Sequence, residues 1–162
     1  MTNYEVAKNG ILIASTKLEI ETPKIDFYIN DCLDTKGINS MFLKEEYKII
    51  FSQDWIEKAD WLEVMVVCFH ETRHAFQYKV ATGNYKGKET IDQLLVDKWL
   101  VEINEYKQPS GVIENDEYYL NQEIEIDAVS FAHYQMSELF KVKTIIPLCI
   151  KVEVNKRINC WN

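Results

Sequence analysis

The stretch from Asp60 to Gly83 constrains the fold of this chain more than any other part of the sequence. Asp60 and Glu63 have the spacing of a capping box, and Gly83 suits a C-terminal cap. Residues 61–81 therefore predict a helix about 30 Å long, at ~1.5 Å per residue. The middle of this stretch is apolar on nearly every side, so we expect the helix to be buried on most of its faces.

The residues before this helix are rich in β-prone side chains. We expect strands at residues 11–15 (ILIAS) and 24–30 (KIDFYIN), because both runs are apolar or β-prone and lie between turn-forming residues. Residues 37–52 predict a β-hairpin whose turn lies near Lys44, Glu45 and Glu46.

The residues after it predict two further helices, at 89–106 and from about Tyr118 to Phe140, on the basis of their apolar stripes. The tail at 144–154 is expected to be a strand or an extended packing segment. Strands followed by helices predict an α+β fold with a small N-terminal β-sheet or hairpin. Because the chain contains no repeat and no linker rich in Pro and Gly, we expect residues 1–162 to form a single domain.

Composition excludes some classes of partner. The net charge of −8 argues against nucleic acid and against an anionic membrane surface, both of which need Lys and Arg. No stretch approaches the ~20 apolar residues of a membrane helix, and the start lacks the features of a signal peptide. We therefore expect a cytoplasmic protein. Its four cysteines form no CxxC pair and are expected to be reduced thiols.

His70 and His74 lie four residues apart on the predicted helix, with Glu71 directly after the first. Positions i and i+4 share a helix face, so both imidazoles can face one metal ion. Glu71 lies ~100° further round, close enough to take a proton from a metal-bound water. This spacing is that of the HExxH motif, and its helical context favours a metal site over two unrelated histidines.

A catalytic zinc site needs a third protein ligand. The remaining histidine, His133, is too far along the chain for a compact motif, so we expect a carboxylate. Glu123 and Asp127 form the one ExxxD pair in the sequence and would share a helix face. We expect Glu123 to bind the metal, Asp127 to accept the spare N–H of a ligand histidine, and Glu125 to lie on a solvated acidic face.

With HETRH followed by EIEID, the chain resembles the zincin metallopeptidases, specifically their gluzincin-like HExxH…ExxxD arrangement. The resemblance implies a zincin-like fold and a Zn²⁺ ion bound by His70, His74 and Glu123. It also implies that Glu71 is the general base, and that a peptide or protein substrate lies along the edge strand of the hairpin. Arg73 departs from this pattern, because its position in the motif often holds a small residue.

No motif in the sequence identifies the residue that would stabilise the oxyanion formed during peptide hydrolysis. Tyr119 is the candidate that helical phase favours, because it lies one turn before Glu123 and nearly in line with it. From Gln108 to Phe140 the chain has no Lys or Arg, which favours the capture of cations.

Two other functional interpretations stay open. A non-catalytic, metal-stabilised binding or regulatory module would use the same ligands, although it would have no need of Glu71. A protein–protein interaction domain without metal would instead draw on the 4 Trp, 9 Tyr and 7 Phe residues of the chain.

Overall fold

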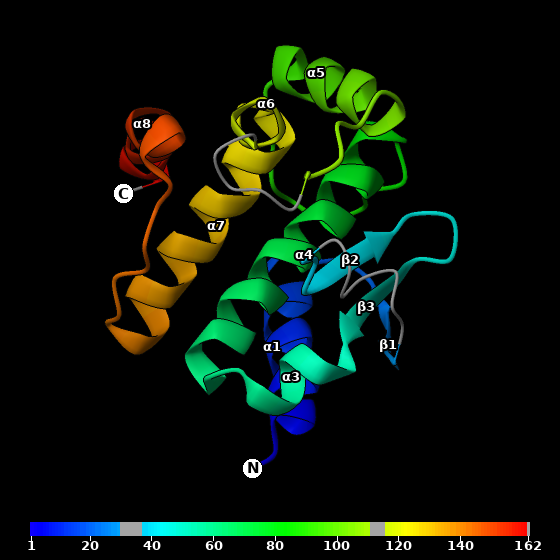
Figure 1. Ribbon diagram of the computed structural model, residues 1–162. Coiled ribbons are helices and arrows are strands. Elements are labelled where there is room, and N and C mark those ends of the chain that lie inside the picture. The colour runs from blue at the N-terminus through cyan, green and yellow to red at the C-terminus, as the bar shows by residue number, and fades with distance from the viewer. Residues whose placement is uncertain (30–36, 111–115, 162) are drawn as a thin grey trace.

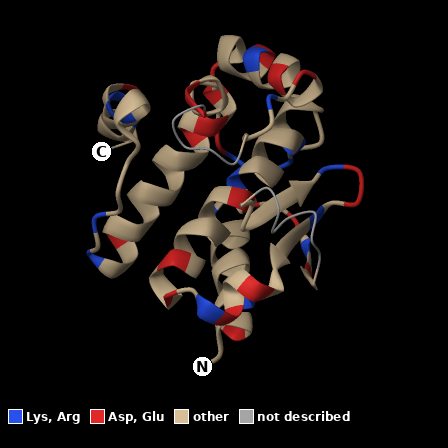
Figure 2. Cartoon of the chain, in the orientation of Figure 1, with Lys and Arg blue, Asp and Glu red and all other residues tan. Residues whose placement is uncertain are grey.

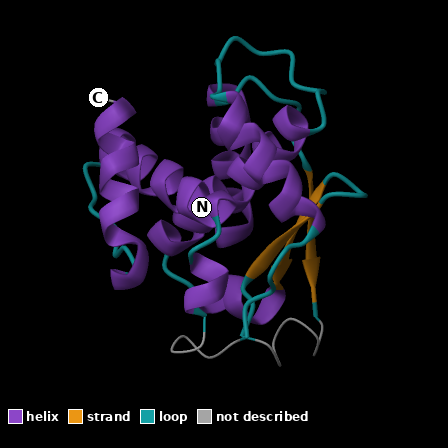
Figure 3. Ribbon diagram, turned by 90° about the horizontal axis from the view of Figure 1, so that it is seen from above, coloured by secondary structure: helices purple, strands orange, loops and turns teal. Residues whose placement is uncertain are grey.

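The computed structural model of the chain describes residues 1–29, 37–110 and 116–161. Helix α4 (Trp61–Ala81) lies at its centre, packed against α1, α5 and α7 and against strand β2 (Figure 1). Both predicted ends of this helix are confirmed, since Asp60 and Glu63 form a capping box and Gly83 adopts a φ of +70°. The chain is α+β, as predicted, with a small sheet beside the helices (Figure 3).

The prediction of a strand at residues 11–15 is wrong, because these residues belong to helix α1 (Asn3–Lys17). Thr2 and Glu5 form a capping box at its start. The buried residues of α1 follow helical spacing, and they are Val6, Ala7, Gly10, Ile11, Ala14 and Ser15. Within the apolar run at 11–15, some side chains face the core and others face solvent. A mostly apolar run of this length fits a short strand as well as a helical turn, so the run alone does not distinguish the two.

The sheet consists of β1 (Lys24–Tyr28), β2 (Ser40–Leu43) and β3 (Lys48–Ser52), in the order β1-β3-β2. Strands β2 and β3 are antiparallel, which confirms the predicted hairpin, and β1 runs parallel to β3. The short helix α3 (Gln53–Lys58) connects the sheet to α4. This order leaves β2 at an edge of the sheet, on the side of α4.

Helices α5, α6 and α7 follow α4 and its C-terminal turn. Helix α5 spans Gln93–Asn104, within the predicted range. The helix predicted from Tyr118 to Phe140 is instead divided into α6 (Glu117–Leu120) and α7 (Glu123–Phe140). The carboxylate of Glu102 on α5 accepts the first two backbone N–H groups of α7, at 2.9 and 2.8 Å. A carboxylate at this position stabilises a helix start, so α5 fixes where α7 begins.

The tail is helical where a strand or an extended segment was expected. A 3₁₀ turn (Leu148–Ile150) leads into α8 (Lys151–Trp161), which packs on α7. Ile150, Val154 and Ile158 recur every fourth residue and form a small apolar cluster with Ile126. That spacing, and not the local alternation of apolar and charged residues, decides the structure of the tail.

Charges of both signs are interspersed over the described elements, without a single basic stripe (Figure 2). None of the described helices is long and apolar enough to cross a membrane. Cys68, Cys149 and Cys160 are free thiols, as predicted, and Cys32 lies outside the described residues.

Candidate metal centre

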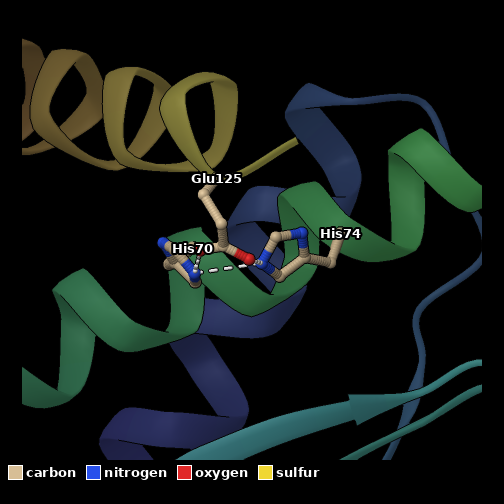
Figure 4. A group of neighbouring side chains, drawn as sticks. All are labelled: His70, His74 and Glu125. Atoms are coloured by element: carbon tan, nitrogen blue, oxygen red, sulfur yellow. Dashed lines mark hydrogen bonds and ion pairs between the residues drawn. The ribbon is translucent and has the colours of Figure 1, made fainter. Parts of the chain in front are cut away.

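Helix α4 places His70 and His74 side by side. Their Nε2 atoms lie 3.0 Å apart, and their rings meet edge to face with centroids 4.6 Å apart (Figure 4). This contact follows from the i, i+4 spacing, which puts two side chains on one face of a helix one turn apart. The predicted convergence of the two imidazoles is therefore present in the structure.

Glu125, in the first turns of α7, completes the cluster. Its Oε1 lies 3.3 Å from Nε2 of His74, and its Oε2 lies 3.3 Å from Nε2 of His70. Figure 4 shows the carboxylate pointing from α7 to the two rings on α4. The three residues each offer one ligand atom, and these atoms all lie within 4.8 Å of one another. They form a group that could hold a metal ion.

The electrostatics of the cluster favour a charged carboxylate. Burial would raise the pKa of Glu125, but the nearby His74 and His70 outweigh it and hold the pKa well below its usual range. Burial would likewise lower the pKa of His74, yet the Glu125 carboxylate outweighs it and raises the pKa to about 9. At neutral pH the metal-free cluster therefore holds the Glu125 carboxylate as an anion paired with a protonated His74, and a metal ion bound here would take the place of that proton.

The polar contacts of Glu125 also fit a metal. Tyr106 Oη donates a hydrogen bond to Glu125 Oε1 at 2.6 Å, whereas Oε2 has no hydrogen-bond donor among the described residues. His70 Nε2 lies 3.3 Å from this oxygen, and a fully buried carboxylate oxygen that accepts no hydrogen bond would be better satisfied by a cation. Two imidazole nitrogens and one carboxylate oxygen are the donor set of many divalent metal sites.

Glu123, the expected third ligand, lies elsewhere. Its carboxylate forms ion pairs with Arg157 at 2.6 Å and with Lys98 at 3.1 Å. Burial would raise the pKa of Glu123, but the hydrogen bonds from Arg157 and Lys98 outweigh it and lower the pKa. Two cations already neutralise this carboxylate, and it is Glu125, not Glu123, that lies beside the two histidines.

The expectation that Glu125 is solvated is accordingly wrong, since its side chain is 0% exposed. A signal for this was present in the sequence. Glu125 lies three and seven residues before Ala128 and Ala132, which share its face of α7 and are buried. Small residues on that face allow α7 to approach α4 closely, and the carboxylate lies on the same side.

Asp127 is buried, as a residue that supports a metal site would be, but it does not contact either histidine ring directly. It accepts hydrogen bonds from Arg73 Nε at 2.7 Å and from Gln77 Nε2 at 2.8 Å. Gln77 in turn contacts Nδ1 of His74 through its Oε1 at 2.8 Å. Gln77, which no sequence motif indicated, lies three residues after His74 and connects it to Asp127.

Glu71 lies beside the cluster and is 7% exposed. Ser40 Oγ on the edge strand β2 donates a hydrogen bond to Glu71 Oε1 at 2.6 Å. Glu71 is close enough to contribute to the raised pKa of His74.

Tyr119 stands on the other side of the cluster, where its ring meets that of Tyr106 at 6.1 Å. Burial and the charge of Glu125 raise the pKa of Tyr119 well above its usual value, so its hydroxyl stays protonated.

A cavity of about 980 Å³ opens onto the two histidines, Glu71 and Tyr119. Strand β2 forms one wall. Side chains of α4, α5 and α6 line other parts of it, and they include Val66, Val67, Ile103 and Leu120. The cluster is thus reached through a large cavity whose walls are mostly apolar.

His133 and Cys68, which also carry atoms that can bind metal, are engaged elsewhere. His133 Nδ1 lies 2.6 Å from Thr144 Oγ1. The buried Cys68 directs its Sγ at the carbonyl of Ala7, at 3.6 Å, on the side of α4 that faces α1.

Comparisons with known proteins add no family assignment: no protein-family model, no curated protein and no solved structure matches this chain.

Proposed function

We propose that this protein is a zinc-dependent metallopeptidase that hydrolyses peptide bonds. The observation that carries the proposal is the meeting of His70 and His74 with the buried Glu125, while Glu71 lies beside them at the wall of a large cavity. A site that only holds a metal has no need of a second carboxylate next to its ligands. The spacing of the four residues supports a hydrolytic site.

Zn²⁺ is the proposed ion, because two imidazoles and one carboxylate are the ligands of many catalytic zinc sites. His70, His74 and Glu125 would hold it through Nε2, Nε2 and a carboxylate oxygen. When bound, zinc would polarise the scissile carbonyl and bring the pKa of a bound water to ~7.

Glu71 is the proposed general base. The hydrogen bond from Ser40 holds one of its carboxylate oxygens in place, and its low exposure of 7% keeps bulk water from competing for the proton. Glu71 would take the proton from the attacking water and then deliver it to the leaving amine. Tyr119 is the proposed hydrogen-bond donor to the oxyanion, since its hydroxyl is neutral and lines the same cavity.

Strand β2 supports an extended peptide as the substrate. It pairs with β3 along one side, and successive backbone groups of an antiparallel strand point to alternate sides. Asn39 O accepts a bond from Ser52 N, so the backbone groups of Ser40 and Phe42 point away from β3. Among the described strands none pairs with this outer edge of β2, and a peptide that paired with it would lie along the cavity, with its side chains against apolar walls.

The proposal is tested by comparing Glu71→Gln with the unaltered protein in two measurements. Zinc content after gel filtration should be unchanged, while cleavage of a mixed peptide library should fall by about 10²–10⁴-fold, the usual contribution of a general base. Zinc retention without cleavage by the unaltered protein would favour a non-catalytic, metal-stabilised module. If the purified protein contains no metal and its folding stability is the same with and without a chelator, a protein–protein interaction domain would be favoured.

A further inference from the structure

Gln77 is fully buried on α4, and its side-chain amide has a single possible orientation. Its Nε2 lies 2.9 Å from the carbonyl oxygen of Ile124 and 2.8 Å from Asp127 Oδ2. A backbone carbonyl and an ionised carboxylate only accept hydrogen bonds, so the NH₂ end of the amide must face them. The oxygen of the amide must therefore face the other way.

That oxygen, Oε1, lies 2.8 Å from Nδ1 of His74. An amide oxygen only accepts, so Nδ1 of the imidazole must carry a hydrogen. A neutral imidazole with its hydrogen on Nδ1 has its lone pair on Nε2. Nε2 is the atom of His74 that faces His70 and Glu125.

We propose that Gln77 is a positioning residue that holds His74 in the tautomer whose Nε2 lone pair faces the metal, and that the Arg73–Asp127 ion pair holds Gln77. The metal part of this inference rests on the proposed function. Gln77 thereby takes the place at His74 that a carboxylate was expected to fill directly.

The ion pair supplies the fixed end of this chain of contacts. Arg73 Nε and Nη2 donate to the two carboxylate oxygens of Asp127, at 2.7 and 3.3 Å, and both side chains are almost fully buried. Four aromatic rings surround the guanidinium within 6 Å of its carbon, and they belong to Phe76, Trp99, Phe131 and Trp161. Because Arg73 donates to both oxygens of Asp127, Asp127 Oδ2 faces Gln77 as a hydrogen-bond acceptor, and the amide of Gln77 cannot reverse.

The same amide also aligns the two helices that carry the ligands. Ile124, whose carbonyl accepts from Gln77, directly precedes Glu125 on α7. One side chain thus fixes the ring of His74 and the start of the helix that bears the carboxylate. Loss of Gln77 should disturb both ligands at once.

The first test compares the zinc affinity of Gln77→Met with that of Gln135→Met, by competition with a chromophoric chelator. Gln135 is a matched control, because it is also buried on a helix but lies ten residues beyond Glu125, about 15 Å along α7. Gln77→Met should bind Zn²⁺ about 10–100-fold more weakly than the unaltered protein, the usual cost of losing a partner of a ligand histidine. Gln135→Met should bind it as the unaltered protein does.

Urea unfolding of both metal-free variants shows whether each is still folded. A weaker zinc affinity in a folded Gln77→Met variant then reflects the lost orientation of the His74 ring and not a loss of folding. Equal zinc affinity in the two folded variants would overturn the inference.

The second test measures the tautomer of His74 by ¹⁵N NMR in the metal-free protein, at alkaline pH where imidazole is neutral. The unaltered protein should show a protonated Nδ1 and an unprotonated Nε2, and Gln77→Met should lose this preference. A protonated Nε2 in the unaltered protein would contradict the inference. Because no metal is needed, a protein that binds no zinc yet holds the Nδ1–H tautomer would refute the proposed function while supporting the role of Gln77.

Discussion

Oε2 of Glu125 lies 3.3 Å from Nε2 of His70, on the inner side of α7 where it meets α4. Glu123, only two residues earlier, points its carboxylate at Arg157 and Lys98 instead. Two acidic residues in the same turn therefore have different partners, and we expect substitutions of the two to have different effects on zinc binding.

Glu125→Gln should weaken zinc binding by more than the 10–100-fold that follows loss of an outer partner, because a ligand and a buried negative charge are both removed. Glu123→Gln is the matched control and should leave the zinc affinity nearly unchanged, since it alters only an ion-paired surface group. Isothermal titration with Zn²⁺ measures both. The reverse order of effects would restore Glu123 as the ligand.

Tyr119→Phe should lower kcat for peptide cleavage by about 10²–10³-fold, the usual effect of removing one donor to an oxyanion. The zinc affinity should change little, because Tyr119 is not a ligand. Steady-state kinetics on a peptide cleaved by the unaltered protein, together with zinc titration, would check this. An unchanged kcat would assign the ring of Tyr119 to packing against Tyr106.

Arg73→Met should destabilise the protein by about 3–5 kcal/mol, the usual result of leaving one member of a buried ion pair without its partner. The chain's other arginine provides the comparison. Arg157 also approaches Asp127, at 3.4 Å, but its side chain is 19% exposed. Arg157→Met should therefore cost less than Arg73→Met in urea unfolding followed by circular dichroism.

The metal-free protein should lose stability as the pH rises from about 6.5 to about 9. The folded protein raises the pKa of His74 from 6.5 to about 9, so protonation of this ring favours folding. This contribution to stability is fully present below pH 6.5, the pKa of His74 in the unfolded chain. It disappears as the pH rises past about 9, the pKa of His74 in the folded protein. It amounts to at most about 3.5 kcal/mol, at about 1.4 kcal/mol per pKa unit.

Urea unfolding in the presence of a chelator, at pH values across this range, measures the effect. Glu125→Gln should flatten the profile, because its charge is what raises the pKa of His74. His133→Gln should leave it unchanged, since burial lowers the pKa of His133 and places its titration below this range. A sloping profile in Glu125→Gln would assign the pH dependence to other groups.

Gly10→Val should destabilise the contact between α1 and α4. A Cβ at Gly10 would lie 2.9 Å from Cys68 Cβ and 3.0 Å from Met65 Sδ, both closer than normal van der Waals contact. Overpacking of this kind costs about 1–3 kcal/mol. Leu12→Val, at a position on α1 that is 53% exposed, should have little effect in the same thermal unfolding experiment.

The sequence predicted those features that depend on short-range patterns. The ends of α4, the hairpin and the convergence of His70 and His74 follow from capping residues, β-propensity and helical spacing, and the structure confirms all three. Glu71 lies beside the histidines, as its place in the motif predicts.

The choice between Glu125 and Glu123 as the proposed third ligand depends on where α7 begins and which face it turns to α4. Glu102, on another helix, accepts the first N–H groups of α7 and so sets its start. Arg157, on α8, holds Glu123 away from the histidines. Both contacts join residues more than 20 positions apart, and local spacing within EIEID could not reveal them.

The two helices that meet at the candidate site would also set how fast a bound ion leaves it. His70 and His74 lie on α4, whereas Glu125 lies on α7, so the three proposed ligands stay together only while these helices remain packed. An ion held in this way would leave chiefly when α7 separates from α4, a local opening that amide hydrogen exchange reports. The rate at which a bound metal ion dissociates would then report the rate at which α7 separates from α4 in the folded protein.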